Sequence, residues 1–303
     1  MQPTLNKITS ILALGLLGVT AMGSAQAADI YGHWNPIMHE DQLERGPGPM
    51  AGDYAGLPIN EAARIRADTW TASLLTVPEH QCKPHPSTYG FRGVGNLRVW
   101  QVIDEATQEL TAIRTHISWQ AQKRVIWMDG REHPDEMYPH TWGGFSTGHF
   151  EGDTLVVETT HIKNSWMRRN GLAFSDQATM LEYFIPHGDT MTHVMMVSDP
   201  VYLDDVFIKT NGFSARADNT MAPYPCRYAI EIERGPGEIP HYMPGQNTAP
   251  VEFAAENGIP YEAGRGGGIT MLPEYMDVVQ EWRMENMTYE ERIGDGIPPG
   301  NRR

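Results

Sequence analysis

The segment FSTGHFEGDTLVVETT, residues 145–160, decides the fold. Its two halves are short runs rich in valine, threonine and aromatic residues, which favour β-strands. Between them, Gly152-Asp153 suits a two-residue hairpin turn with glycine in first position. The segment therefore predicts an antiparallel hairpin.

Similar short runs separated by turn residues occur on both sides of this hairpin. They span residues 97–103, 109–119, 123–128, 179–185, 191–197, 206–213 and 226–232. No long helical pattern alternates with them, which argues against parallel βαβ units. The sequence predicts an all-β fold with a few peripheral helices, an antiparallel meander closed as a lipocalin-like barrel or folded as a sandwich.

The N-terminal residues 1–27 have the pattern of a secretory signal peptide. Lys7 precedes a short apolar run, and Ala25-Gln26-Ala27 forms a cleavage site before Ala28. The apolar run is too short for a membrane span, and no later segment supplies one. We expect a periplasmic or secreted protein, cleaved after Ala27, without an integral membrane segment.

The mature chain divides into three regions by composition. Residues 28–58 are rich in glycine, proline and acids and predict an extended arm lying on the body of the protein. Residues 59–234 predict a single β-barrel domain that begins with a helix capped by Asn60. Residues 235–303 form a Pro/Gly-rich tail with one helix at about 273–284, expected to pack across the barrel.

Charge and cysteine content narrow the possible partners. The net charge of −15 argues against nucleic acid, which requires clustered lysine and arginine. Two cysteines in an exported chain, Cys82 and Cys226, most simply form a disulfide. The alternative is a metal site, because Cys82 lies between His80 and His85.

The hairpin carries the main candidate site. With a Gly152-Asp153 turn, one face holds Phe145, Thr147, His149, Val156, Glu158 and Thr160. We expect this face to line a ligand cavity, where Glu158 orients His149 for general acid–base catalysis. A three-residue turn would instead place His149 beside His161 and favour a metal site, and a solvated sheet face is the simplest alternative.

Further candidates lie outside the hairpin. On the strand at 109–119, Arg114 and His116 face away from the aliphatic side, so Arg114 is a candidate partner for a carboxylate or oxyanion and His116 a second acid. His39 of the arm is a candidate at the cavity mouth. The candidate substrate-binding residues are Trp119, Trp142, Thr147 and Thr160.

The chain resembles an uncharacterised family of exported bacterial proteins, found mainly in proteobacteria and acidobacteria. The resemblance rests on HEDQLERGPGP, VPEHQCKPHP, KRVIWMDGREHP, GHFEGDTLVVETT, SDPVYL and APYPC, and covers most of the mature chain to about residue 226. It implies a Cys82–Cys226 pairing. It implies no activity or catalytic residue.

These observations favour an exported, cofactor-independent enzyme of lyase, isomerase or cyclase type. It would act on a small apolar or aromatic molecule by His/Glu acid–base chemistry, with His149 as the main base or acid. A carrier for a lipophilic ligand is the first alternative, and a histidine-dependent metal-binding protein is the second. The sequence does not indicate an oligomeric state.

Overall fold

A computed structural model of the protein describes residues 29–38, 45, 48–73, 78–92, 95–218, 220–224, 226–230 and 233–293. The predicted signal peptide and His39 lie outside these residues. Cys82 and Cys226 form a disulfide with a Cα–Cα distance of 5.6 Å. The predicted pairing is therefore confirmed, and Cys82 is not a metal ligand.

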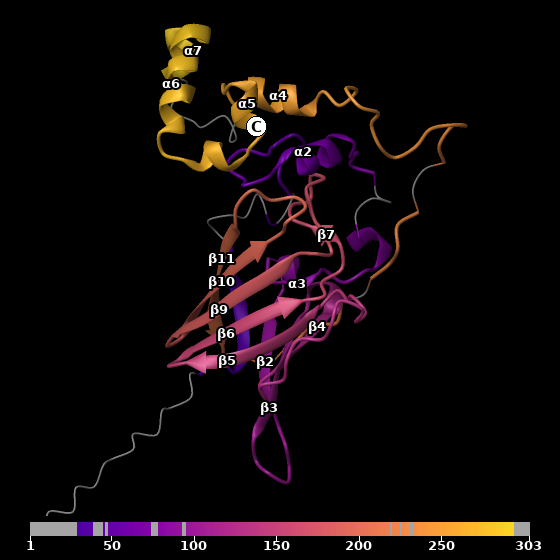
Figure 1. Ribbon diagram of the computed structural model, residues 1–303, viewed down its shortest axis with the longest axis vertical. Helices are drawn as coiled ribbons and strands as arrows, with labels where there is room; N and C mark the ends of the chain where they lie inside the picture. The colour runs from indigo at the N-terminus through magenta and orange to yellow at the C-terminus, as the bar shows by residue number, and fades with distance from the viewer. Residues whose placement is uncertain are drawn as a thin grey trace, which may run out of the picture.

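Nine strands of the described chain form a closed barrel (Figure 1). They are β1 (Gly32–Ile37), β2 (Leu97–Ile103), β3 (Leu110–Ile117), β4 (Gln122–Trp127), β5 (Phe145–Glu151), β6 (Thr154–Thr160), β9 (Thr179–His187), β10 (Thr190–Ser198) and β11 (Phe207–Arg216). Their order is β1-β11-β10-β9-β6-β5-β4-β3-β2, and β1 also pairs with β2. The prediction of an all-β barrel is confirmed.

The strand pairing departs from a simple meander at one place. Strands β4 and β5 are parallel, with Ile126 opposite Ser146 and Trp127 opposite Thr147. A parallel pair requires a long connection that returns the chain to the starting end of the sheet. Residues 128–144 provide this connection, and they carry His133 and His140.

Strand β1 corrects the expectation of an arm over residues 28–58. It pairs with β11 on one side and β2 on the other, so its backbone groups close the barrel and remove two open edges. Trp34 anchors it, since the indole is buried and its N–H donates to the Ile30 carbonyl oxygen at 2.9 Å.

The prediction of a strand at residues 226–232 is wrong, because residues 226–230 form no strand.

Two apolar clusters form the core. One fills the barrel and includes Trp34, Ile113, Val157 and Phe213. The other lies between the barrel end and the segments that cover it, including helix α2 (Glu61–Asp68), which Figure 1 shows above the sheet. The Asn60 side chain accepts a hydrogen bond from the backbone N–H of Ala63 and begins α2 as predicted.

The remaining elements are short or peripheral. They are η2 (Pro78–Gln81), α3 (Ser87–Gly90), η3 (Trp119–Ala121), β7 (Ser165–Trp166), β8 (Ala173–Phe174), α4 (Ala249–Glu256), α5 (Tyr261–Gly264), η4 (Gly268–Met271), α6 (Tyr275–Asn286) and α7 (Tyr289–Ile293). No helix among the described residues has both the length and the apolar character to span a membrane.

Helix α6 lies where a helix was predicted but does not pack across the barrel. Figure 1 shows α6 and α7 stacked to one side of α5, above the strands. Within its predicted apolar stripe Val279 is buried, whereas Val278 is 48% exposed. Arg283 ties α6 to the segment that follows α4 by donating to the Gly258 carbonyl oxygen at 2.8 Å.

Candidate functional site

The β5–β6 hairpin has the predicted turn and register. Glu151 pairs with Thr154 around the two-residue turn, and His149 lies opposite Val156. Gly152 has a φ of 60°, which a glycine adopts without steric cost. The three-residue turn, and with it the shared face of His149 and His161, is excluded.

The predicted catalytic face nevertheless points out of the barrel. His149 and Glu158 are exposed, and His149 Nε2 lies 3.2 Å from Glu151 Oε1 instead of contacting Glu158. The opposite face carries Leu155 and Val157, which are almost completely buried. Burying these aliphatic side chains stabilises the fold by about 1.5–3 kcal/mol each, so they occupy the interior. The prediction that His149 and Glu158 form a pair inside a cavity is therefore wrong.

The candidates on β3 also lie outside. Arg114 is exposed and His116 half-buried on the outer surface. Burial lowers the pKa of His116, and the neighbouring Lys123 and Arg98 lower it further, so its imidazole is neutral. Trp119 does not line the interior either, since its indole N–H donates to His85 Nε2. The alternation of side chains along β3 correctly separated Arg114 and His116 from the aliphatic face. It did not show whether the face of Arg114 met solvent or a cavity.

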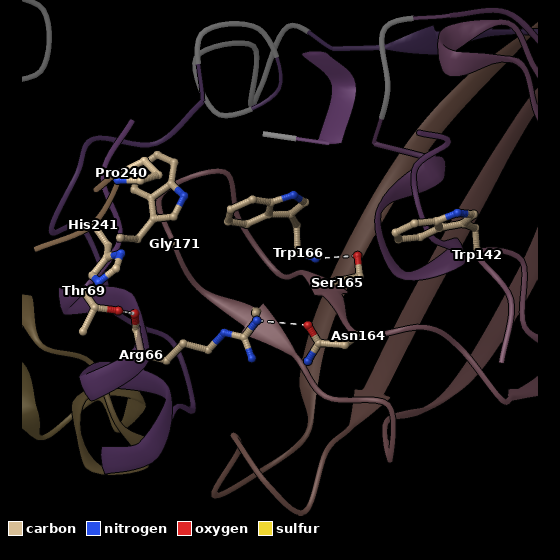
Figure 2. Close-up of a pocket in the computed structure, with 11 residues that line it drawn as sticks. Arg66, Thr69, Trp142, Asn164, Ser165, Trp166, Gly171, Pro240 and His241 are labelled. Carbon is tan, nitrogen blue, oxygen red and sulfur yellow. Dashed lines mark hydrogen bonds between the residues drawn. The ribbon is translucent and has the colours of Figure 1, made fainter. Parts of the chain in front are cut away.

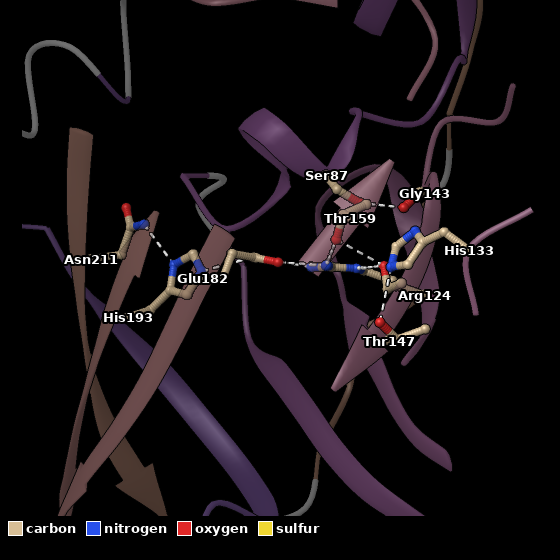
Figure 3. A network of polar contacts seen from close by, with 10 residues as sticks. Ser87, Arg124, His133, Gly143, Thr147, Thr159, Glu182, His193 and Asn211 are labelled. Atoms are coloured by element: carbon tan, nitrogen blue, oxygen red, sulfur yellow. Dashed lines mark hydrogen bonds and ion pairs between the residues drawn. The ribbon is translucent and has the colours of Figure 1, made fainter. Parts of the chain in front are cut away.

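The interior instead contains a buried polar layer. Arg124 on β4 donates to both carboxylate oxygens of Glu182 on β9, to Ser146 Oγ at 2.9 Å and to Thr159 Oγ1 (Figure 3). Desolvation would raise the pKa of Glu182, but Arg124 and hydrogen bonds from His193 and Arg124 bring it below its usual value. The carboxylate is therefore ionised although it is fully buried.

The layer continues from Glu182 to His193 and Asn211. The Asn211 amide donates to His193 Nδ1 at 3.0 Å, so His193 carries its proton on Nε2 and donates to Glu182 at 2.9 Å. Asn211 Oδ1 in turn accepts from Arg45 at 3.0 Å. Both ring nitrogens of His193 are thus occupied, which suits a rigid structural layer better than a proton-transfer site.

Sequence reasoning missed this layer, although the signal was present. Arg124 alternates with the buried Ile126, and Glu182 lies between the buried Met180 and Phe184. Period two therefore places both charges on the apolar faces of their strands. A buried charge requires a buried partner, so Arg124 and Glu182 could have been paired on that ground.

Three other histidines gather on the outer surface of the hairpin. His133 Nε2 lies 2.9 Å from Thr147 Oγ1, and His133 Nδ1 lies 2.8 Å from Thr160 Oγ1. Thr160 Oγ1 lies 2.7 Å from His161 Nδ1, and His161 Nε2 lies 2.8 Å from the Asp135 carbonyl oxygen. The predicted binding residues Thr147 and Thr160 are thus engaged with histidines. Burial lowers the pKa of His133, against the opposing effect of Glu158.

The donors and acceptors in this chain of hydrogen bonds follow from the Asp135 carbonyl oxygen at its end. A carbonyl oxygen can only accept, so His161 donates from Nε2 and, when neutral, accepts at Nδ1 from the Thr160 hydroxyl. Thr160 then accepts from His133 Nδ1, and Thr147 donates to His133 Nε2. His161 itself has a left-handed φ of 55°, a conformation uncommon outside glycine. Both histidines are held in one orientation.

His140 differs from its neighbours because one ring nitrogen stays available. Its Nδ1 donates to the Ile162 carbonyl oxygen at 3.1 Å, which leaves the lone pair on Nε2. Among the described residues Nε2 has no hydrogen-bond partner. The ring centroids of His140 and His161 lie 5.2 Å apart.

His140 and His161 line a cleft of about 670 Å³, whose wall also contains Thr160 and the exposed carboxylates Glu136 and Asp176. We call it the histidine cleft. The sequence patterns assigned no role to His140. A parallel bridge between Thr141 and Ile162 brings it to His161, and this long-range pairing has no sequence signal. No group of three His, Cys, Asp or Glu side chains in the described chain is arranged to hold a metal ion.

Figure 2 shows a second cleft, of about 640 Å³. Trp70, Trp142 and Trp166 line it together with Arg66 and Asn164, and we call it the tryptophan cleft. Trp142 was predicted to contact a ligand inside the barrel. It lies instead at this external cleft, so the predicted location is wrong. That Trp142 contacts a ligand remains a prediction.

Comparison with known proteins gives no match to a family model, to a curated protein or to a solved structure. The resemblance noted from the sequence therefore stays a prediction. Function has to be inferred from the two clefts themselves.

Proposed function

We propose that the protein is an exported enzyme that transfers a proton to and from a small molecule, in a reaction of lyase or isomerase type, within the histidine cleft. His140 is the proposed base. This role replaces that of His149, which is exposed on the outer face of the hairpin.

One observation carries the proposal: His140 lines the cleft, its ring is oriented by the hydrogen bond from Nδ1 to Ile162, and its Nε2 has no hydrogen-bond partner among the described residues. The Ile162 carbonyl oxygen holds Nδ1–H, as a carboxylate does in many acid–base enzymes. A base must be accessible and oriented, and His140 meets both requirements. His133, His161 and His193 use both ring nitrogens in hydrogen bonds and do not.

The acidic residues of the cleft support the charged state that forms during turnover. When Nε2 takes a proton, the imidazolium lies in a cleft lined by Glu136 and Asp176. Their negative charges stabilise this cation. His140 can then return the proton to another substrate atom, as in an isomerisation, or to a leaving group, as in an elimination.

Export is proposed on two grounds. The N-terminal sequence has the pattern of a cleaved signal peptide. The Cys82–Cys226 disulfide agrees with an oxidising compartment.

The test uses 5-nitrobenzisoxazole, a general probe for carbon deprotonation that opens to a coloured phenolate when a base removes its proton. We expect His140→Gln to lower the rate about a hundredfold, because glutamine has no basic nitrogen. The matched control is His149→Gln, an exposed histidine of the same hairpin, which should keep the wild-type rate.

Circular dichroism and thermal unfolding would verify that both variants fold. A rate unchanged by His140→Gln, or no acceleration over buffer by the wild-type protein, would contradict the proposal. Loss of rate in His149→Gln alone would restore the assignment made from the sequence.

A further inference from the structure

We propose that the tryptophan cleft binds planar aromatic carboxylates. This inference does not depend on the proposed proton transfer, because it concerns a separate cleft and predicts binding alone.

The volume and the aromatic walls of the cleft fit a ligand of one or two fused rings. About 640 Å³ lies within the range of small-molecule sites. Trp70 and Trp166 meet edge to face, with ring centroids 5.9 Å apart at 80°. Trp142 presents its indole in the same cleft, as Figure 2 shows. Indole faces favour flat, apolar ring systems.

The backbone holds this aromatic wall in place. Gly171 has a φ of 99°, and a Cβ atom there would lie 2.7 Å from Trp70 Cβ. A bridge joins Trp70 to His241, and the Tyr242 N–H donates to the Thr69 carbonyl oxygen at 2.8 Å. The Trp70 indole N–H is buried and makes no hydrogen bond with the described residues.

The charges around the cleft favour an anion. The whole chain carries a net charge of −15, yet none of the described residues lining the cleft is aspartate or glutamate. Arg66 is the charged side chain in the lining, and its two guanidinium hydrogen bonds go to neutral oxygens, Tyr202 Oη at 2.7 Å and Asn164 Oδ1 at 3.0 Å. Figure 2 shows the contact with Asn164 at the cleft wall.

A second cation adds to this field. Lys163 Nζ lies 5.4 Å from the centre of the Trp142 ring. Arg66 makes no ion pair with the described residues, so its charge is available to a carboxylate. Aromatic walls combined with unneutralised cations fit a flat ring system that carries a carboxylate.

The experiment measures binding by isothermal titration calorimetry with 2-naphthoate and with 2-naphthalenemethanol, which has the same rings but no charge. We expect the wild-type protein to bind naphthoate at least about tenfold more tightly than the alcohol. Arg66→Gln should remove this preference and Arg66→Lys should keep part of it. Trp142→Ala should weaken both ligands, and Trp142→Phe should weaken them less.

Arg114→Gln is the matched control, because Arg114 is an exposed arginine on the outer face of β3 and should not affect either ligand. His140→Gln should also leave both affinities unchanged, which separates this proposal from the proposed catalysis. Equal affinity for the two ligands, a preference that survives Arg66→Gln, or no binding of either ligand would overturn the inference.

Discussion

The two faces of the β5–β6 hairpin carry the same kinds of polar residues and use them differently. On the inner face, Ser146 and Thr159 accept hydrogen bonds from Arg124, whose charge is neutralised by Glu182. On the outer face, Thr147 and Thr160 hold His133. Two adjacent threonines of β6 thus have different partners. Thr159 contacts the buried Arg124–Glu182 ion pair, and Thr160 contacts the histidines on the outer surface.

The difference teaches that access matters more than residue type for assigning function. Inside the barrel every member of the chain from Arg124 to Asn211 is bonded to protein, and an interior charge pair is retained only when it is satisfied in this way. Outside, His140 lines a cleft, and its Nε2 has no hydrogen-bond partner in the part of the chain that the structure describes. The interior layer is fully hydrogen-bonded within the protein, whereas the outer cluster is where we propose proton transfer.

The largest expected effect separates two glutamates on opposite sides of the sheet. Glu182→Gln should lower the free energy of unfolding by about 3–5 kcal/mol, because it leaves Arg124 charged, buried and without its counterion. Glu158→Gln, on the exposed outer face, should change it by less than about 0.5 kcal/mol. Urea unfolding followed by circular dichroism measures both. Equal losses would show that the interior pair contributes no more than a surface charge.

A smaller effect separates the adjacent threonines. Thr159→Val removes a hydrogen bond to a buried guanidinium and should cost about 2 kcal/mol of unfolding free energy. Thr160→Val breaks the contacts with His133 and His161 in a half-buried region and should cost about 1 kcal/mol or less. The same urea titration compares them. A greater loss for Thr160→Val would reverse the proposed contrast between the faces.

A further prediction concerns the dependence of stability on pH. Burial lowers the pKa of His85 to about 3, whereas an unfolded histidine titrates near 6.5. The folded state therefore binds fewer protons, and the stability from neutral His85 is fully present above pH 6.5 and is lost as pH falls toward 3. We expect a loss of about 1.4 kcal/mol per pH unit below 6.5 from this residue.

Unfolding measured at pH 7.0, 6.0 and 5.0 would test this expectation. His85→Gln should have a shallower dependence on pH than the wild type, although it is less stable at pH 7 because Trp119 loses its partner. His149→Gln, which removes an exposed histidine, should keep the wild-type slope. Parallel slopes for the wild type and His85→Gln would show that His85 is not held neutral by burial.

Local sequence patterns predicted a large part of the fold. The runs that became β2 to β6 and β9 to β11 were identified because strand residues and turn dipeptides act over a few positions. Asn60 marked the start of α2 for the same reason. The missed elements depend on distant pairing: β1 is a strand because it fills the gap between β2 and β11, and β4 and β5 are parallel because residues 128–144 return the chain.

The candidate sites show the same division. The sequence by itself determined the Gly152-Asp153 turn, and with it which side chains of β5 and β6 share a face, because strand side chains alternate with period two. Only the tertiary structure decided which face is inside, because that choice depends on the apolar area buried by all strands when the barrel closes. It also decided the neighbours of His140, because the bridge from Thr141 to Ile162 joins segments that no local pattern connects.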